Sequence, residues 1–161
     1  MTAPVATDDL VQGAHTYLST QPDVLAVLGS YGTGVAWLWP HQLVATIENS
    51  QSTAAVIVRQ PGWAAPNVHN TMRFPRIGIE ITGDPLRDAG NNITDPNEVI
   101  RRLEAVYRII DAHLHRPQGG DQMWGTVRTI ACARLVEPYV YPIADGNGMQ
   151  CLTVSYGVTE G

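Results

Sequence analysis

Hydrophobic residues recur with helical spacing over one long stretch of the chain, from Thr94 to Arg116. Asp95 is placed to cap a helix there, Pro96 suits the first helical position, and Glu98 completes a carboxylate form of the capping box. Recurrence at i, i+3, i+4 and i+7 is typical of one buried stripe, here Val99, Ile100, Leu103, Val106, Tyr107, Ile110 and Leu114. We expect a solvated opposite face that carries Arg101, Glu104, Arg108 and Asp111.

The first thirty residues predict two more helical segments. Thr7 can cap the first one, and its apolar side comprises Leu10, Val11, Ala14, Tyr17 and Leu18. The pair Gln21-Pro22 ends this helix. A shorter helical segment then runs from Pro22 to Leu28 and stops at Gly29, because glycine commonly ends helices.

Alternation of apolar and polar residues predicts strands elsewhere, at residues 35–40, Leu43–Ile47, Ala54–Arg59 and Ile77–Ile81. The last of these is expected to run centrally, with one face on the core. Two long alternating segments follow the main helix, Thr126–Val136 and Met149–Val158. Turn residues Asp145–Gly148 lie between them, so the segments predict a long hairpin with an extended tip.

These elements predict an α/β (α+β) fold. It would be a small, mixed, mostly antiparallel sheet with helices packed on one side, a long loop and a closing β-hairpin. A chain of 161 residues is expected to form a single domain over positions 1–161. The beginning of the chain lacks signal-peptide character, and no apolar run approaches the length of a membrane span. We therefore expect no membrane association and no export by a signal peptide.

The segment Gln60–Pro75 is the strongest candidate for a binding surface. It is too irregular for a strand ladder and is longer than most connections, and such loops are usually functional. Its Trp, Met and Arg residues are typical of protein contacts, although a loop that merely folds back over the core remains the alternative. With other exposed-looking aromatic and arginine residues, the candidate interface comprises Trp63, His69, Met72, Arg73, Arg76, Trp124, Tyr139 and Tyr141.

Composition and motifs predict no catalytic, cofactor or metal site. A net charge of -5 and a pI near 5.4 argue against a phosphate-gripping surface, so specific nucleic-acid binding is not expected. Cys132 and Cys151 lie in apolar runs and are expected to be buried thiols. His113 and His115 stand at i, i+2, which points their rings to different sides of a helix. No hydrolase, zincin or C-x-x-C motif occurs, and an enzyme is not expected.

The order of elements resembles the tail terminator proteins of long-tailed phages, the family that includes lambda's U protein. The resemblance rests on the two early helices ending at Gly29, the strand Ile77–Ile81, the helix from Asp95 to Arg116 and the closing hairpin. It implies a homo-oligomeric ring, usually of six copies, at the head-proximal end of the tail tube. The implied partners are the tail tube protein and a neck or head-completion protein. The implied location is the virion tail and neck, with assembly in the host cytoplasm and DNA passing through the lumen.

The long loop Gln60–Pro75 and the tip Tyr139–Gly148 depart from the compact members of that family. Two rivals from the same particle stay open, a head-closure protein and a tail tube subunit. A tube subunit should consist mainly of long strands, which the dominant helix disfavours. An alternative from another class is a small-molecule enzyme or binding domain. The sequence disfavours it, because it shows no convergent set of polar groups of the kind that a pocket needs.

Overall fold

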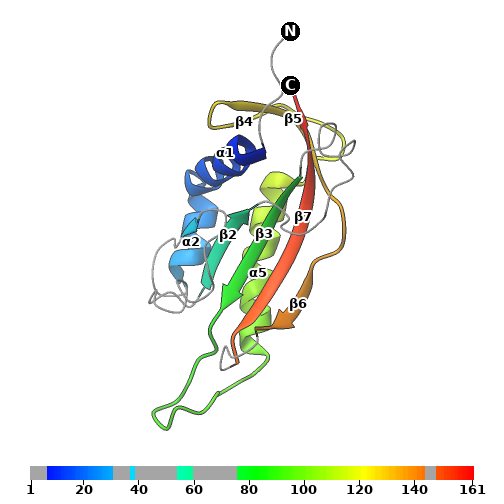
Figure 1. Cartoon of the computed structure of the whole chain (residues 1–161). Coiled ribbons are helices and arrows are strands. Elements are labelled where there is room, and N and C mark those ends of the chain that lie inside the picture. Colours follow the sequence, from blue (N-terminus) through cyan, green and yellow to red (C-terminus); the bar gives the residue numbers. More distant parts are fainter. Residues whose placement is uncertain (1–6, 31–36, 39–53, 60–75, 144–147) are drawn as a thin grey trace.

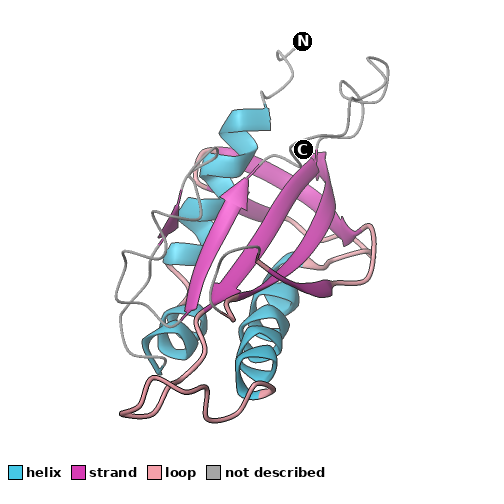
Figure 2. Ribbon diagram, turned by 60° about the horizontal axis from the view of Figure 1, so that its bottom comes forward, coloured by secondary structure: helices cyan, strands magenta, loops and turns pink. Residues whose placement is uncertain are grey.

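The computed structural model describes residues 7–30, 37–38, 54–59, 76–143 and 148–161. In this part of the chain one sheet lies against helices on one side (Figures 1 and 2), and the predicted α+β class is confirmed. The helices are α1 (Thr7–Ser19), α2 (Pro22–Ser30) and α5 (Glu98–Leu114). The strands are β1 (Trp37–Leu38), β2 (Ala54–Arg59), β3 (Arg76–Gly83), β4 (Gln122–Trp124), β5 (Val127–Arg134), β6 (Tyr139–Pro142) and β7 (Gln150–Glu160).

The sheet is mixed and mostly antiparallel, as the alternation predicts. Its strand order is β1-β2-β3-β7-β5-β4, and β6 also pairs with β7. Only the pair of β1 and β2 is parallel among the described strands. β3 runs between β2 and β7, which confirms its central position.

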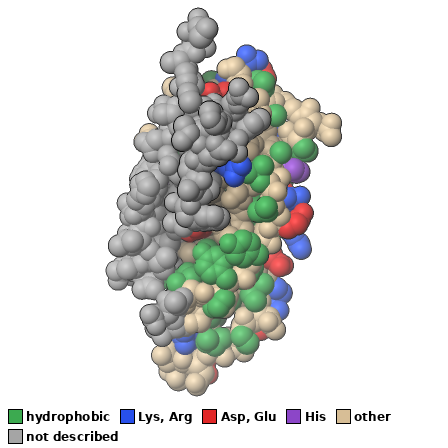
Figure 3. All heavy atoms as spheres, turned by 45° about the vertical axis from the view of Figure 1, so that its right-hand side comes forward, with side chains coloured by type: hydrophobic (Ala, Val, Ile, Leu, Met, Phe, Trp, Pro, Cys, Tyr) green, Lys and Arg blue, Asp and Glu red, His purple; other side chains and the backbone are tan. Residues whose placement is uncertain are grey.

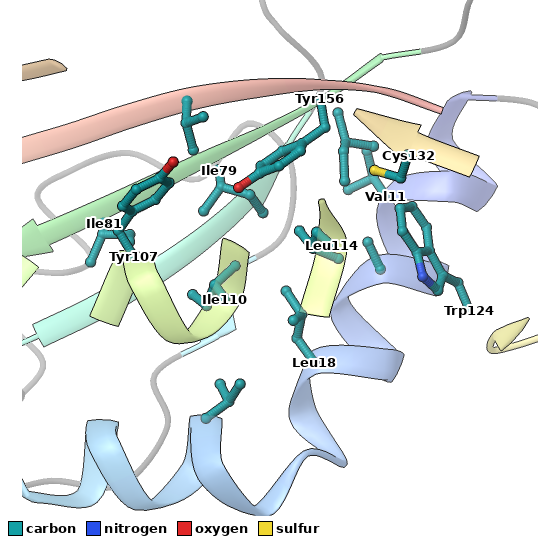
Figure 4. Packing of buried hydrophobic residues seen from close by; sticks show 14 of the residues in the cluster. Val11, Leu18, Ile79, Ile81, Tyr107, Ile110, Leu114, Trp124, Cys132 and Tyr156 are labelled. Atoms are coloured by element: carbon teal, nitrogen blue, oxygen red, sulfur yellow. The ribbon is translucent and has the colours of Figure 1, made fainter. Parts of the chain in front are cut away.

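One buried cluster joins the helices to one face of the sheet. Ile77, Ile79 and Ile81 of β3 are fully buried there with the inward residues of β7. The apolar stripe of α5 and the inner sides of α1 and α2 complete the cluster (Figure 4). Among the described residues, α5 lies against β3 and β7, α1 lies against β3, and α2 packs on α5 and α1.

One face of β3 lies on the core, as predicted, and the other face is buried as well. Glu80 and Thr82, which alternate with the isoleucines, are 9% and 1% exposed. A central strand in this fold is therefore covered on both sides, although its pattern of apolar and polar residues is that of a half-buried strand.

The main helix also begins later than predicted. α5 starts at Glu98, not at the predicted cap, and ends at Leu114. Asp95 still acts at this end of the helix, because its Oδ1 accepts a hydrogen bond from the Asn97 backbone N–H at 2.9 Å. Pro96 and Asn97 form a turn that precedes the first helical residue. The predicted stripe is buried from Val99 to Leu114 except at Ile100, which is half-buried.

The closing hairpin is confirmed, and part of its tip is a strand. β7 is 11 residues long, and β3 pairs along one of its edges. β5 and then β6 pair along the other edge in succession. The predicted strand Leu43–Ile47, the loop Gln60–Pro75 and the turn residues 145–147 lie outside the described residues.

Candidate protein-interaction surface

The face of the sheet opposite the helices, here called the outer face, is built from small side chains along β7. Leu152, Val154, Tyr156 and Val158 point into the core, so the alternate residues Thr153, Ser155 and Gly157 point outward. These three are half-buried. Small residues there leave room for larger side chains from the neighbouring strands to lie across β7.

An irregularity between β5 and β6 supplies such side chains. Arg134 pairs with Tyr156, and Tyr139 pairs with Thr153. Four residues, 135–138, therefore stand opposite two residues of β7. The excess must bulge away from the sheet, although the Leu135 backbone N–H still bonds to the Ser155 carbonyl at 2.9 Å. As a result Leu135 is 46% exposed and Val136 is 55% exposed.

Leu135 lies over Gly157, because a Cβ on that glycine would stand only 3.1 Å from Leu135 Cδ2. Arg76 is paired with the same glycine from the β3 side and is exposed. Farther along β7, Tyr139 and Tyr141 pair with Thr153 and Cys151. We call these four outer-face residues, Arg76, Leu135, Tyr139 and Tyr141, the edge patch; the first two lie at Gly157 and the tyrosines lie farther along β7.

The edge patch is largely apolar and aromatic. Tyr139 is 59% exposed, and its ring lies 5.8 Å from that of Tyr141. Figure 3 shows hydrophobic side chains gathered on the face seen when the β6 and β7 side of the molecule comes forward. Exposed apolar side chains that gather on one face commonly mark a site of protein contact.

The predicted interface is only partly assembled by the fold. Tyr139 and Tyr141 lie side by side on the outer face, and Arg76 lies on the same face opposite Gly157, whereas Trp63, His69, Met72 and Arg73 lie outside the described residues. Sequence reasoning missed Leu135 and Val136, because their exposure depends on the pairing register. The only hint in the sequence is Pro138, which suits an interruption of a ladder.

The prediction that Trp124 belongs to the interface is wrong. Its side chain is fully buried, in the same cluster as Val11 and Cys132 (Figure 4). α1 crosses β4 at Gly13, whose missing side chain lets Trp124 approach closely, since a Cβ there would stand 3.1 Å from Trp124 Cβ. The indole N–H donates to Gln122 Oε1 at 2.7 Å. This bond satisfies the one polar atom of a core tryptophan.

The outer edge of β6 is poorly suited to adding another strand. The Ile143 backbone N–H donates to the Met149 carbonyl at 3.0 Å, so alternation directs the backbone groups of Tyr139 and Tyr141 toward β7 as well. The backbone groups of Val140 and Pro142 then point away from the sheet. Proline has no N–H, which leaves this short edge with few donors. Contacts at the edge patch therefore depend on side chains.

A charged cluster fastens the base of the bulge to α5. The Tyr156 hydroxyl donates to Asp111 Oδ1 at 2.7 Å, and Arg134 donates to Asp111 Oδ2 at 3.1 Å and to the Tyr107 hydroxyl at 2.5 Å. The expectation that Asp111 lies on a solvated face is wrong, because its side chain is only 17% exposed. Burial, with the bond to the carboxylate, raises the pKa of Tyr156 and keeps the phenol protonated.

A second polar chain links α2, α5, α1 and β4. His113 Nε2 lies 2.7 Å from Asp23 Oδ1, and His113 Nδ1 lies 3.3 Å from the Tyr17 hydroxyl. Gln122 Nε2 donates to that hydroxyl at 2.7 Å. The rings of His113 and His115 diverge as predicted, since His115 Nδ1 accepts from the Arg134 backbone N–H.

An acid, a histidine and a hydroxyl linked in this order by hydrogen bonds are the groups that activate a nucleophile in some enzymes. Here, however, the Tyr17 hydroxyl lies 3.3 Å from His113 Nδ1 and accepts a shorter hydrogen bond, 2.7 Å, from Gln122. The chain is better explained as a support for the junction of the four elements, because it connects side chains that are up to 105 residues apart in sequence.

The described part of the chain shows no group of three or more potential metal ligands. Cys132 and Cys151 are buried thiols, as predicted. No described helix has both the length and the apolar character needed to cross a membrane.

The chain matches no protein-family model, and no curated protein matches it significantly. A chain in the solved virion of a native gene transfer agent (GTA) particle shares its fold with a TM-score of 0.52. That likeness covers 92% of this chain and 94% of the other, at 12% sequence identity. At this level of identity the likeness concerns the fold, and it extends over nearly the whole of both chains.

Proposed function

We propose that this protein is a structural component of a phage-like particle. The observation that carries the proposal is the fold shared, over nearly the full length of both chains, with a chain of a gene transfer agent virion. The sequence-level resemblance to phage tail terminators points in the same direction. Two independent routes thus lead to the same class of particle.

The particular role proposed is that of a tail terminator. Copies of the chain form a closed ring, with six as the expected number, at the head-proximal end of the tail tube. The ring contacts the last tube subunits on one side and a neck protein on the other. Heterologous contacts that close by rotation give a finite ring, and a finite ring stops growth because it does not present a new tube end.

The edge patch supports a role based on protein contacts. It offers exposed Tyr139 and Leu135 beside Arg76 on a rigid sheet, and tyrosine and arginine are enriched at interfaces. An enzymatic role is not proposed, because the chain of Asp23, His113 and Tyr17 is accounted for by its place at the junction of four described elements.

A tail tube subunit is less well supported. A tube that extends its sheet from one subunit to the next needs strand edges with free donors and acceptors. Pro142 removes a donor from the outer edge of β6, and the described helices occupy the inner face of the sheet. These features suit a ring that ends a tube better than a unit that repeats along it.

The experiment is to assemble particles in cells that lack the protein and to measure tail length by negative-stain electron microscopy. The proposal predicts tubes of uncontrolled length that are not joined to heads. Supplying the protein in trans should restore uniform, joined tails. Tails of normal length joined to heads in the absence of the protein would contradict the terminator role.

A further inference from the structure

We infer that a protruding loop of one copy of this chain binds the edge patch of the next copy. The inference rests on the proposed ring and specifies the contact that builds it. The loop, residues 84–94 and here called the protrusion, leaves the end of β3 and projects beyond the sheet before the chain returns to α5 (Figures 1 and 2).

The protrusion is held in one conformation by its own hydrogen bonds. The Thr94 N–H donates to the Leu86 carbonyl at 3.2 Å, and the Asp88 N–H donates to the Asn92 carbonyl at 2.9 Å. Asp88 Oδ1 accepts from the N–H groups of Gly90 and Asn92, each at 2.9 Å. A segment ordered in advance loses little conformational entropy when it docks.

The base of the protrusion is fastened to the main helix. Arg102 is only 2% exposed, and its Nη1 donates to the Asp84 carbonyl at 2.7 Å. The same guanidinium is paired with Glu98 one turn earlier in α5. The protrusion therefore moves with the body of the molecule, and its contacts can set the angle between neighbouring copies.

Alternation along the protrusion gives it two faces. Arg87 and Ile93 are bridge partners, and Ile93 Cδ1 would stand 2.8 Å from a Cβ on Gly148, so this face lies against the body. Leu86 and Asp88 belong to the other face, and Asp84 continues their alternation. Leu86 is 48% exposed, and both aspartates are exposed. The free face thus presents an apolar side chain between two carboxylates.

The edge patch has the complementary character. Leu135 and Tyr139 offer apolar area, and the exposed Arg76 guanidinium has no side-chain partner among the described residues. The nearby acid Glu137 is exposed and lies 4.0 Å from Arg134, which is paired more closely with Asp111. Leu86 can insert beside Tyr139 and Leu135 while Asp84 or Asp88 approaches Arg76, since opposite charges on facing surfaces favour and orient association.

A second copy is the occupant that fits, because both halves of the contact occur on the same chain at different places. The protrusion lies at one end of the sheet, and the edge patch lies on its outer face. Such a contact is heterologous, and one copy can use its protrusion and its patch at the same time. A closed ring follows when the rotation between copies closes.

Sedimentation velocity of the full chain tests the contact. Leu86→Ser disables the protrusion and Tyr139→Ser disables the edge patch. We expect each to raise the concentration for half-assembly by about tenfold or more, as removal of a central anchor does. Met123→Ser is the matched control, since Met123 is an exposed apolar residue, 54% accessible, on neither surface. It should assemble as the wild type does.

Mixing the two disabled variants gives the sharper result. Each retains one intact surface, so an equimolar mixture should form a 1:1 dimer and no larger species. Charge reversal adds a second readout: Arg76→Asp and Asp84→Arg should each weaken assembly, and the double variant should regain it. All variants alter exposed side chains, so circular dichroism should show unchanged folding.

Variants Leu86→Ser and Tyr139→Ser that form rings at wild-type concentrations would overturn the inference, and so would a wild-type chain that stays monomeric at every concentration. A mixture of the two variants that remains monomeric would also overturn it. The tail-length experiment decides the proposed function separately. If the substituted variants still formed rings like those of the wild type, this contact would be excluded and the terminator role would stand.

Discussion

Replacing Gly13 by alanine should destabilise the protein, although the same change usually strengthens a helix. Gly13 lies within α1, where alanine is normally favoured by about 1 kcal/mol. Here the added Cβ would overlap the backbone carbonyl oxygen of Trp124 and stand 3.1 Å from Trp124 Cβ. A backbone atom cannot rotate away, so α1 and β4 must separate.

Overpacking of this kind costs about 1–3 kcal/mol, which exceeds the gain in helix propensity of about 1 kcal/mol. The expected net loss in the free energy of unfolding is about 1 kcal/mol. Gly29→Ala is the matched control, because Gly29 is exposed in α2 and a Cβ there meets no atom within 4 Å. That variant should be stabilised by about 0.5–1 kcal/mol.

Urea unfolding followed by circular dichroism measures both variants, and an unchanged denaturant slope would show that only stability differs. The two glycines should shift the midpoint in opposite directions. If Gly13→Ala stabilised the protein as much as Gly29→Ala does, the close crossing of α1 over Trp124 would be refuted.

Three further predictions concern the polar clusters and the thiols. Tyr156→Phe removes a buried hydrogen bond to the Asp111 carboxylate and should cost about 1.5–3 kcal/mol in urea unfolding; a loss below about 0.5 kcal/mol would contradict that bond. The hydrogen bond from His113 lowers the pKa of Asp23 below 3.8, so its contribution is present above that pH and is lost as the pH falls through the folded pKa. Wild type and Asp23→Asn should therefore differ in unfolding midpoint at pH 6 and converge near pH 2, whereas a constant difference would exclude this linkage. Burial raises the pKa of Cys132 to about 12, so iodoacetamide at pH 8 should alkylate this thiol only in urea, and rapid native labelling would show that it is accessible.

The parts of the fold that were predictable rest on local periodicity. The stripe from Val99 to Leu114 and the alternation in β7 each lie within one element and need no knowledge of partners. The boundaries were less predictable. Asp95 has the chemistry of a cap, but Pro96 and Asn97 form a turn before α5 begins.

The missed residues depend on contacts between distant segments. Asp111 and Arg102 flank the two sides of the α5 stripe, and helical spacing alone does not show whether such a residue meets solvent or a partner. Arg134 and Tyr156 decide the matter for Asp111. A charged residue beside an apolar stripe should therefore be read as a candidate for a buried ion pair.

The residue types of the candidate surface could be predicted from the sequence, but the strand pairing that exposes them could not. Tyr139 and Tyr141 were expected at an interface because aromatic residues are enriched there. The excess of residues 135–138 over their β7 partners exposes Leu135, and alternation in one strand cannot reveal it. Trp124 was wrongly assigned to the interface because α1, a distant segment of the chain, buries its side chain. Gly13 is the signal for that contact, since glycine inside a helix often marks a close approach.

The position of the protein within assembled particles tests the account most directly. A peptide tag joined after Gly161, which is exposed at the end of β7, can be labelled with gold on intact particles and viewed by electron microscopy. The account predicts label at one place, where the tail tube meets the head, and label at one end of tubes detached from heads. Label along the whole tube, on the head shell or absent from particles would contradict it.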